Sequence, residues 1–160
     1  MNRNNPLQAN MPLDHQQLRE ILPYSFPFVL IDRVIEYKEG ESLTAIKNIT
    51  ANEWPFNQDI AQATHFPETL IIEAAAQAAL ILYKISKPQE INKESLFVLG
   101  RIQAEFQKEV KVGSQLQLKV SVGKVLKTGG YSNVTIFADA ESVCEVQVIY
   151  GVKSKSGATL

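Results

Sequence analysis

The sequence has few of the residues that bind metal ions or form disulfides. It contains one cysteine, Cys144, and two histidines that lie far apart, His15 and His65. One cysteine excludes an internal disulfide and a cysteine-based zinc site, and two distant histidines make a poor metal cluster. We therefore expect no metal and no cofactor.

Charge of one sign and long apolar runs are also missing. The net charge is −1 and no basic run occurs, so composition gives no indication of a nucleic-acid partner.

Residues 1–17 lack an apolar run of signal-peptide length, which favours a cytoplasmic protein without a membrane span. The glycines of 123–130 do not form a phosphate loop, because Lys127-Thr128 precedes the paired glycines instead of following them. With 160 residues, 45% of them hydrophobic, the chain suits a single soluble domain.

What the sequence does have is one central stretch, residues 54–84. Within it, residues 71–82 are apolar except for Glu73 and Gln77, a pattern that predicts a buried helix. Twelve residues fall short of a membrane span. Glu73 and Gln77 are four apart and share one face of that helix. A buried carboxylate is costly unless it is paired or neutralised, so Glu73 is either a structural partner of a neighbouring amide or a tuned acid or base.

The remaining segments predict short strands around this helix. Residues 14–22 predict a short helix with Asp14 as N-cap, and Thr69 is a plausible N-cap for the central helix. Thr128-Gly129-Gly130 predicts a hairpin turn. The predicted strands are 28–37 and 42–49 before the central helix, and 96–102, 104–110, 115–122, 131–138 and 143–152 after it. This order favours an α+β fold in which one antiparallel sheet wraps around one helix.

Several motifs resemble the bacterial (3R)-3-hydroxyacyl-[acyl-carrier-protein] dehydratases. They include ILP at 21–23, LIDRV at 30–34, AIKNIT at 45–50 and LIIEAAAQA at 70–78, with Phe106, Val110, Gly113, Leu116 and Glu145 further along. The resemblance runs from about residue 21 to 152. It implies the hotdog fold, which we place at residues 14–153. Residues 1–13 are rich in Asn and Gln and are expected to form a disordered tail, and residues 154–160 a flexible tail. The resemblance also implies homodimers, or a higher oligomer, as the working unit.

The same resemblance implies where the chemistry lies. The family pairs a histidine from one subunit with a helix glutamate from the other, and the glutamate falls on Glu73. The family histidine precedes that glutamate by fourteen residues, a position occupied here by Asp59. His65 belongs to a His-Phe-Pro tripeptide like that of the family, but taking it as the catalytic histidine needs two gaps, so it is the alternative to Asp59. Substrate binding is expected at Glu68, Thr69 and Gln77.

Three functions follow from this arrangement. The first is a dehydratase-like protein that acts on acyl-carrier-protein or coenzyme A thioesters. The second is a non-catalytic acyl-binding or partner subunit of a hotdog dehydratase. It is favoured because the family's histidine falls on Asp59, a weaker base that ionises near pH ~3.9, and the family's loop glycines fall on Gln58, Gln62 and Glu68. The third is a hotdog thioesterase, in which a carboxylate attacks the thioester or activates water.

Overall fold

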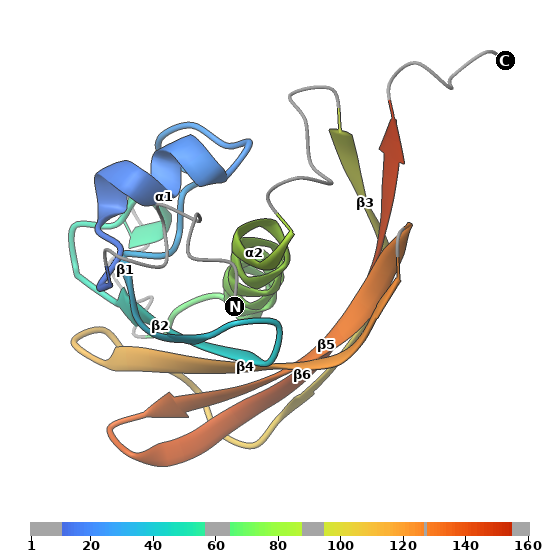
Figure 1. The fold of residues 1–160 in the computed structure, drawn as a ribbon. Helices are drawn as coiled ribbons and strands as arrows, with labels where there is room; N and C mark the ends of the chain where they lie inside the picture. The colour runs from blue at the N-terminus through green and yellow to red at the C-terminus, as the bar shows by residue number, and fades with distance from the viewer. Residues whose placement is uncertain (1–10, 57–64, 88–94, 127, 155–160) are drawn as a thin grey trace, which may run out of the picture.

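The fold is one antiparallel sheet curved around one long helix (Figure 1). The computed structural model describes residues 11–56, 65–87, 95–126 and 128–154. Its sheet has six strands in the order β1-β2-β4-β5-β6-β3. The elements are α1 (His15–Ile21), β1 (Arg33–Lys38), β2 (Ser42–Asn48), the 3-10 turn η1 (Trp54–Phe56), α2 (Glu68–Ser86), β3 (Ser95–Phe106), β4 (Gln115–Leu126), β5 (Gly129–Ala138) and β6 (Glu141–Ser154).

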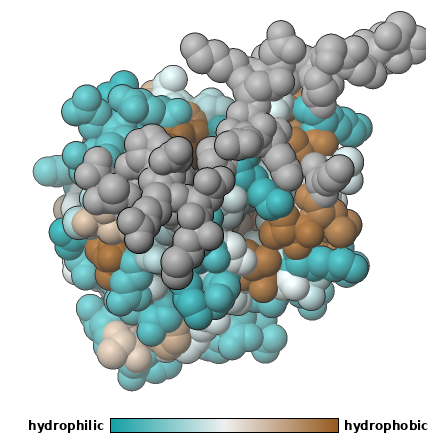
Figure 2. Space-filling view, viewed as in Figure 1, coloured by the Kyte–Doolittle hydropathy of each residue, from teal (hydrophilic) through white to brown (hydrophobic). Residues whose placement is uncertain are grey.

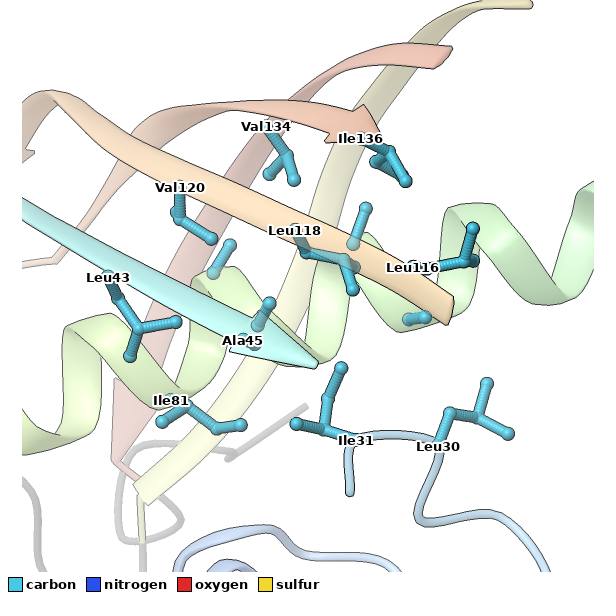
Figure 3. Close-up of a cluster of buried hydrophobic side chains, with 14 of the residues drawn as sticks. Leu30, Ile31, Leu43, Ala45, Ile81, Leu116, Leu118, Val120, Val134 and Ile136 are labelled. Carbon is cyan, nitrogen blue, oxygen red and sulfur yellow. The ribbon is translucent and has the colours of Figure 1, made fainter. Parts of the chain in front are cut away.

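The predicted central helix is α2, and its apolar side chains form the core with the concave face of the sheet. Figure 3 shows Ile81 of α2 among inward-pointing side chains of β2, β4 and β5. Ala74, Ala75, Ala78 and Ala79 are almost fully buried, so the small residues let the helix lie close to the strands. Alternation places Leu116, Leu118 and Val120 of β4 on the same inner face, as their pattern predicts.

The start and the length of α2 differ from the prediction. The N-cap position is Pro67, not Thr69, which is the second helical residue and is exposed. Proline is compatible with a helix start because its φ, −57° here, is already helical and its missing N–H is not needed. The helix therefore reaches 19 residues. By length and composition α2 is the one helix in the described ranges that could cross a membrane, but most of it is buried and it serves as the core helix.

The N-terminal helix follows the prediction. Asp14 Oδ1 accepts a hydrogen bond from Gln17 N, and Asp14 N donates to Gln17 Oε1, both at 2.9 Å. This reciprocal pair is a capping box. Leu13 just before it is fully buried and pairs with Val34, so this part of the predicted tail lies within the domain. Ser154, the first residue of the predicted C-terminal tail, ends β6. The rest of the two predicted tails, residues 1–10 and 155–160, lies outside the described residues.

Two strand predictions were wrong at their boundaries. The strand expected over 28–37 begins only at Arg33, because the backbone of Phe28 and Leu30 bonds to a helix side chain instead of a neighbouring strand. The two strands expected over 96–102 and 104–110 are one strand, β3, paired with β6 along its length. A register shift between Leu99 and Arg101 changes which residues of β3 face inward. The alternation of apolar and polar residues is therefore interrupted inside the strand, as it would be between two strands.

The predicted hairpin turn joins β4 and β5, where Leu126 pairs with Gly129. Gly129 has φ +147°, and a Cβ at this position would collide with the backbone oxygen of Tyr150. The turn therefore needs glycine both for its backbone conformation and for close packing against β6. Four strands follow the central helix in place of the five predicted from the sequence, because two of those five are the single strand β3.

Candidate active site

Glu73 lies in the second turn of α2, on the side of the helix that lines a cavity together with residues of β3 and β6. Its carboxyl is half-buried. Gln77, one turn later, donates from Nε2 to Glu73 Oε1 at 2.9 Å. The sequence predicted that these two side chains share a face, and the structure brings them into direct contact.

Gln77 also holds the segment that precedes β1. It is 1% exposed; its Oε1 accepts from Leu30 N at 2.9 Å and its Nε2 donates to Phe28 O at 2.8 Å. The amide nitrogen has two hydrogens, and Glu73 and Phe28 use both. Gln77 therefore fixes the Glu73 carboxyl and the chain opposite it at the same time.

A small cavity of about 120 Å³ lies against Glu73. Its walls come from α2, from the edge strand β3, from β6 and from Tyr24. The lining residues are Tyr24, Glu73, Ala76, Leu80, Phe97, Val98, Leu99, Val148 and Tyr150. Most of these side chains are apolar, so the cavity suits a hydrocarbon chain with a polar, reacting end at Glu73.

Burial sets the protonation of this site. Loss of water around Glu73 raises the pKa of its carboxyl, and the hydrogen bond from Gln77 lowers it by a smaller amount. Burial and the nearby Glu73 charge also raise the pKa of the Tyr24 hydroxyl. No ion pair in the described part of the chain includes Glu73, so Arg33 and Arg101 do not neutralise it. Glu73 thus has the environment of a proton-carrying acid rather than of a structural salt bridge.

His65 lies elsewhere in the same subunit. Its Nε2 is 2.9 Å from Glu109 Oε2, and its side chain is 40% exposed. The backbone of His65 pairs with that of Lys111 in an isolated β-bridge, and Phe66 N donates a hydrogen bond to Val110 O. These backbone contacts hold the His65 segment in place. His65 is not among the described residues that line the cavity at Glu73.

The other predicted site residues divide into two groups. Glu68 and Thr69 form the first turn of α2 and are exposed. Glu68 also affects Cys144 of β6 electrostatically. Burial raises the pKa of the Cys144 thiol to about 11, and the negative charges of Glu68 and Glu145 contribute to the increase. Asp59 lies outside the described residues.

Comparison with known proteins places the chain in a family. A FabA-like domain matches residues 22–153. The chain belongs to the FabA-like family. The 3-hydroxyacyl-[acyl-carrier-protein] dehydratase FabZ of Bacillus subtilis, a FabA-like relative, is 38% identical over 141 residues, which cover 88% of this chain and 98% of the relative. The resemblance to these dehydratases is confirmed, and the chain is a dehydratase-like member of the FabA-like family.

Solved structures confirm the hotdog fold of this FabA-like chain. The dehydratase heterocomplex ApeI:P from Xenorhabdus doucetiae aligns with a TM-score of 0.73 at 19% identity and covers 87% of this chain and 92% of the matched chain. A mutant thioesterase, PA1618, from Pseudomonas aeruginosa aligns with a TM-score of 0.65 at 14% identity, covering 88% and 94%. At these identities both matches speak for the fold alone.

The sequence missed most of the cavity wall of this FabA-like site. Phe97 and Tyr150 line the cavity although neither carries a motif. Tyr150 could have been found from parity, because it alternates with the inward-facing Val146 and Val148 on β6. Phe97 could not be assigned so simply, because the register shift near Gly100 interrupts the alternation of β3.

A larger cavity of about 420 Å³ lies on the other side of the 28–30 segment, between α1 and the end of β2. Three of the charged groups in its wall, Asp32, Lys47 and Glu53, have hydrogen-bond or ion-pair partners. Lys47 Nζ is 2.9 Å from Glu53 Oε2, and Asp32 Oδ2 accepts from both Asn48 N and Asn48 Nδ2. These pairs hold the loop after β2 in place, and we assign them a structural role.

Proposed function

We propose that this chain removes water from 3-hydroxyacyl thioesters, with Glu73 as one of the two groups that move protons. The observation that supports this most is the Glu73 carboxyl, which is half-buried, has a raised pKa and faces a mainly apolar cavity. Carboxyls in such surroundings are suited to general acid–base catalysis. The relative FabZ is named for acyl-carrier-protein substrates, so we take acyl carrier protein as the carrier and coenzyme A as the alternative.

The reaction needs two coordinated proton transfers. A base takes a proton from C2, which the thioester carbonyl acidifies, and an acid protonates the C3 hydroxyl, which leaves as water while the C2–C3 double bond forms. Because its pKa is raised, Glu73 keeps its proton to a higher pH and suits the acid role. The base is then Asp59 of the other subunit, or His65 in the alternative arrangement. Backbone N–H groups at Glu68 and Thr69, the first turn of α2, would polarise the carbonyl.

A homodimer is the second part of this proposal. The outer edge of β3 has no strand beside it within the described residues, and hydrophobic side chains reach the surface on this side of the molecule (Figure 2). Leu96, Val98 and Leu99 of β3 are 50%, 37% and 54% exposed. An exposed apolar edge strand invites pairing with another strand, and a second copy of β3 closes the sheet with two-fold symmetry. A cytoplasmic location stays part of the proposal.

Charge defines a register for that dimer. Glu105 lies directly across from Glu145 of β6, and neither Glu105 nor Arg101 forms an ion pair within the described part of the chain. If two copies of β3 pair antiparallel about Gln103, each Arg101 lies opposite the partner subunit's Glu105. This pairing offsets the repulsion between Glu105 and Glu145. It pairs residues 100–106 of the two strands, so Leu96, Val98 and Leu99 lie just beyond the end of the partner's β3.

Charge reversal on β3 tests this register. Arg101→Glu and Glu105→Arg should each weaken the dimer by about 10-fold or more, and the double variant should restore it, because attraction across the interface is exchanged for repulsion and back. Sedimentation velocity measures the dimer fraction, with Lys119→Glu on the interior strand β4 as control. A wild type that is monomeric at micromolar concentration would contradict the proposed homodimer. Single variants that remain dimeric would contradict the proposed register.

A non-catalytic partner subunit is the second candidate function. It is favoured by His65, which contacts Glu109 and lies away from the Glu73 cavity within the subunit. ApeI:P is a dehydratase heterocomplex, which gives a precedent for a chain of this fold that works together with a different chain. In this case the chain would bind an acyl group and support a catalytic partner without turnover of its own.

The product of the reaction separates these functions. With 3-hydroxyacyl thioesters, we expect wild type to form an ultraviolet-absorbing enoyl thioester, and Glu73→Gln to lower the rate by about 10²-fold or more. The free energy of unfolding should fall by at most ~1–2 kcal/mol, because glutamine keeps the shape and removes a buried charge. Glu20→Gln on the exposed face of α1 is the matched control. Release of a free thiol would identify a thioesterase, and acyl binding without either product would identify the partner subunit.

A further inference from the structure

The cavity at Glu73 extends along α2 from Glu73 toward Leu80. Glu73, Ala76 and Leu80 line it in order along α2, and seven residues of helix span about 10 Å. If the reacting carbons lie at Glu73, as the proposed function requires, the rest of the acyl chain runs toward Leu80. The end of the cavity beyond Leu80 therefore decides how long that chain can be.

Two aromatic rings close this end. Phe97 of β3 and Tyr150 of β6 line the cavity, and the ring of Tyr83 packs edge-on against both, with centroid distances of 5.5 and 5.3 Å. Tyr83 is 2% exposed, so the space behind the two rings is filled. Such edge-to-face contacts stabilise one arrangement of the three rings.

The end wall is also fixed from outside the cavity. Lys84 Nζ lies 5.3 Å from the centroid of Phe97 and donates to Ile21 O at 2.6 Å. Its ammonium is thus anchored to the end of α1 while it lies over the Phe97 ring. The hydroxyl of Tyr150 packs over Gly130, where an added Cβ would come within 3.2 Å of it. These contacts favour the observed positions of the Phe97 and Tyr150 rings.

The size of the cavity agrees with a closed end. A volume of about 120 Å³ is smaller than the ~150 Å³ cavity that holds one benzene molecule. By this comparison it accommodates about six carbons or fewer. Leu99 lines the cavity and is 54% exposed at the edge of β3, so the cavity reaches the surface on which the dimer is proposed.

We propose that Phe97 and Tyr150 form a fixed end wall that restricts this chain to short 3-hydroxyacyl groups, of about six carbons beyond the carbonyl or fewer. This inference rests on the proposed function, because it takes Glu73 as the position of the reacting carbons. It assigns Phe97 and Tyr150 as residues that determine chain-length specificity.

Binding of a chain-length series tests the wall. Stable amide analogues of 3-hydroxyacyl pantetheine with four, six, eight and twelve carbons are titrated into the full-length protein by calorimetry. Affinity should rise about fourfold per added methylene while the chain still fits, and the twelve-carbon analogue should bind at least about 10-fold more weakly than the best short one.

Truncation of Phe97 should allow the cavity to bind longer acyl chains. Phe97→Ala opens the end of the cavity, so the twelve-carbon analogue should then bind at least as tightly as the six-carbon one, and Phe97→Leu should give an intermediate preference. Phe137→Ala is the matched control, because Phe137 also lies under a lysine, Lys119 at 4.9 Å, but does not line the cavity. Urea titration confirms that each variant is folded.

Each outcome is decisive. Wild type that binds twelve and six carbons equally, or a folded Phe97→Ala that keeps the short-chain preference, overturns the wall while leaving the proposed function in place. Absence of binding at every length overturns the proposed function and this inference with it.

Discussion

Asp59→His is expected to raise the rate of dehydration by about 100-fold, the typical effect of a positioned acid–base group. The position lies fourteen residues before Glu73, where the resemblance to the dehydratases implies a histidine. An aspartate ionises near pH ~3.9 and is a weak base at neutral pH, whereas an imidazole with a pKa near ~6.5 accepts a proton more readily. The gain is measured as formation of the enoyl thioester.

The same assay decides between the two placements of the second catalytic group. His65→Ala should change the rate little, because His65 contacts Glu109 away from the Glu73 cavity. Asp59→Asn, which removes the charge without supplying an imidazole, controls for the substitution itself, and His15→Ala controls for loss of a histidine. Strong wild-type turnover that is abolished by His65→Ala and indifferent to Asp59→Asn would show that His65 is the catalytic residue.

The sequence predicted those features of the fold that follow from local patterns. The apolar run of α2, the capping residue Asp14 and the strict alternation of β4 all formed as expected. Features set by distant residues were predicted poorly. The strand β1 starts late because Gln77, 47 residues from Leu30, takes the backbone hydrogen bonds that a longer strand would have used.

The site divides in the same way. The shared face of Glu73 and Gln77 follows from helical spacing, so the sequence predicted it. The raised pKa of Glu73 depends on burial by β3, β6 and Tyr24, which only the packed fold defines. The end wall depends on contacts between Tyr83, Phe97 and Tyr150, which come from three separate elements and share no sequence pattern.

Gln77→Leu is expected to lower the free energy of unfolding by about 3 kcal/mol. Leucine has a similar volume but leaves Leu30 N and Phe28 O buried without their partners, and each such group costs about 1–3 kcal/mol. Urea titration measures the loss. Gln147→Leu on the exposed face of β6, where the amide makes a hydrogen bond to Asn133, is the control and should cost less than ~1 kcal/mol.

A second substitution at the same position separates the loss of hydrogen bonds from the loss of polarity. Gln77→Glu keeps an oxygen that can accept from Leu30 N, but it brings a second carboxyl against Glu73, and the two compete for a proton. The folded state then holds a proton that the unfolded state has released, so the pair stabilises the fold below the unfolded carboxyl pKa. That contribution is lost as pH rises through the raised folded value. Gln77→Glu should therefore lose stability more steeply than wild type as pH rises above the unfolded carboxyl pKa. If both variants match the stability of wild type at every pH, Gln77 does not hold the Phe28–Leu30 backbone and the Glu73 carboxyl in place.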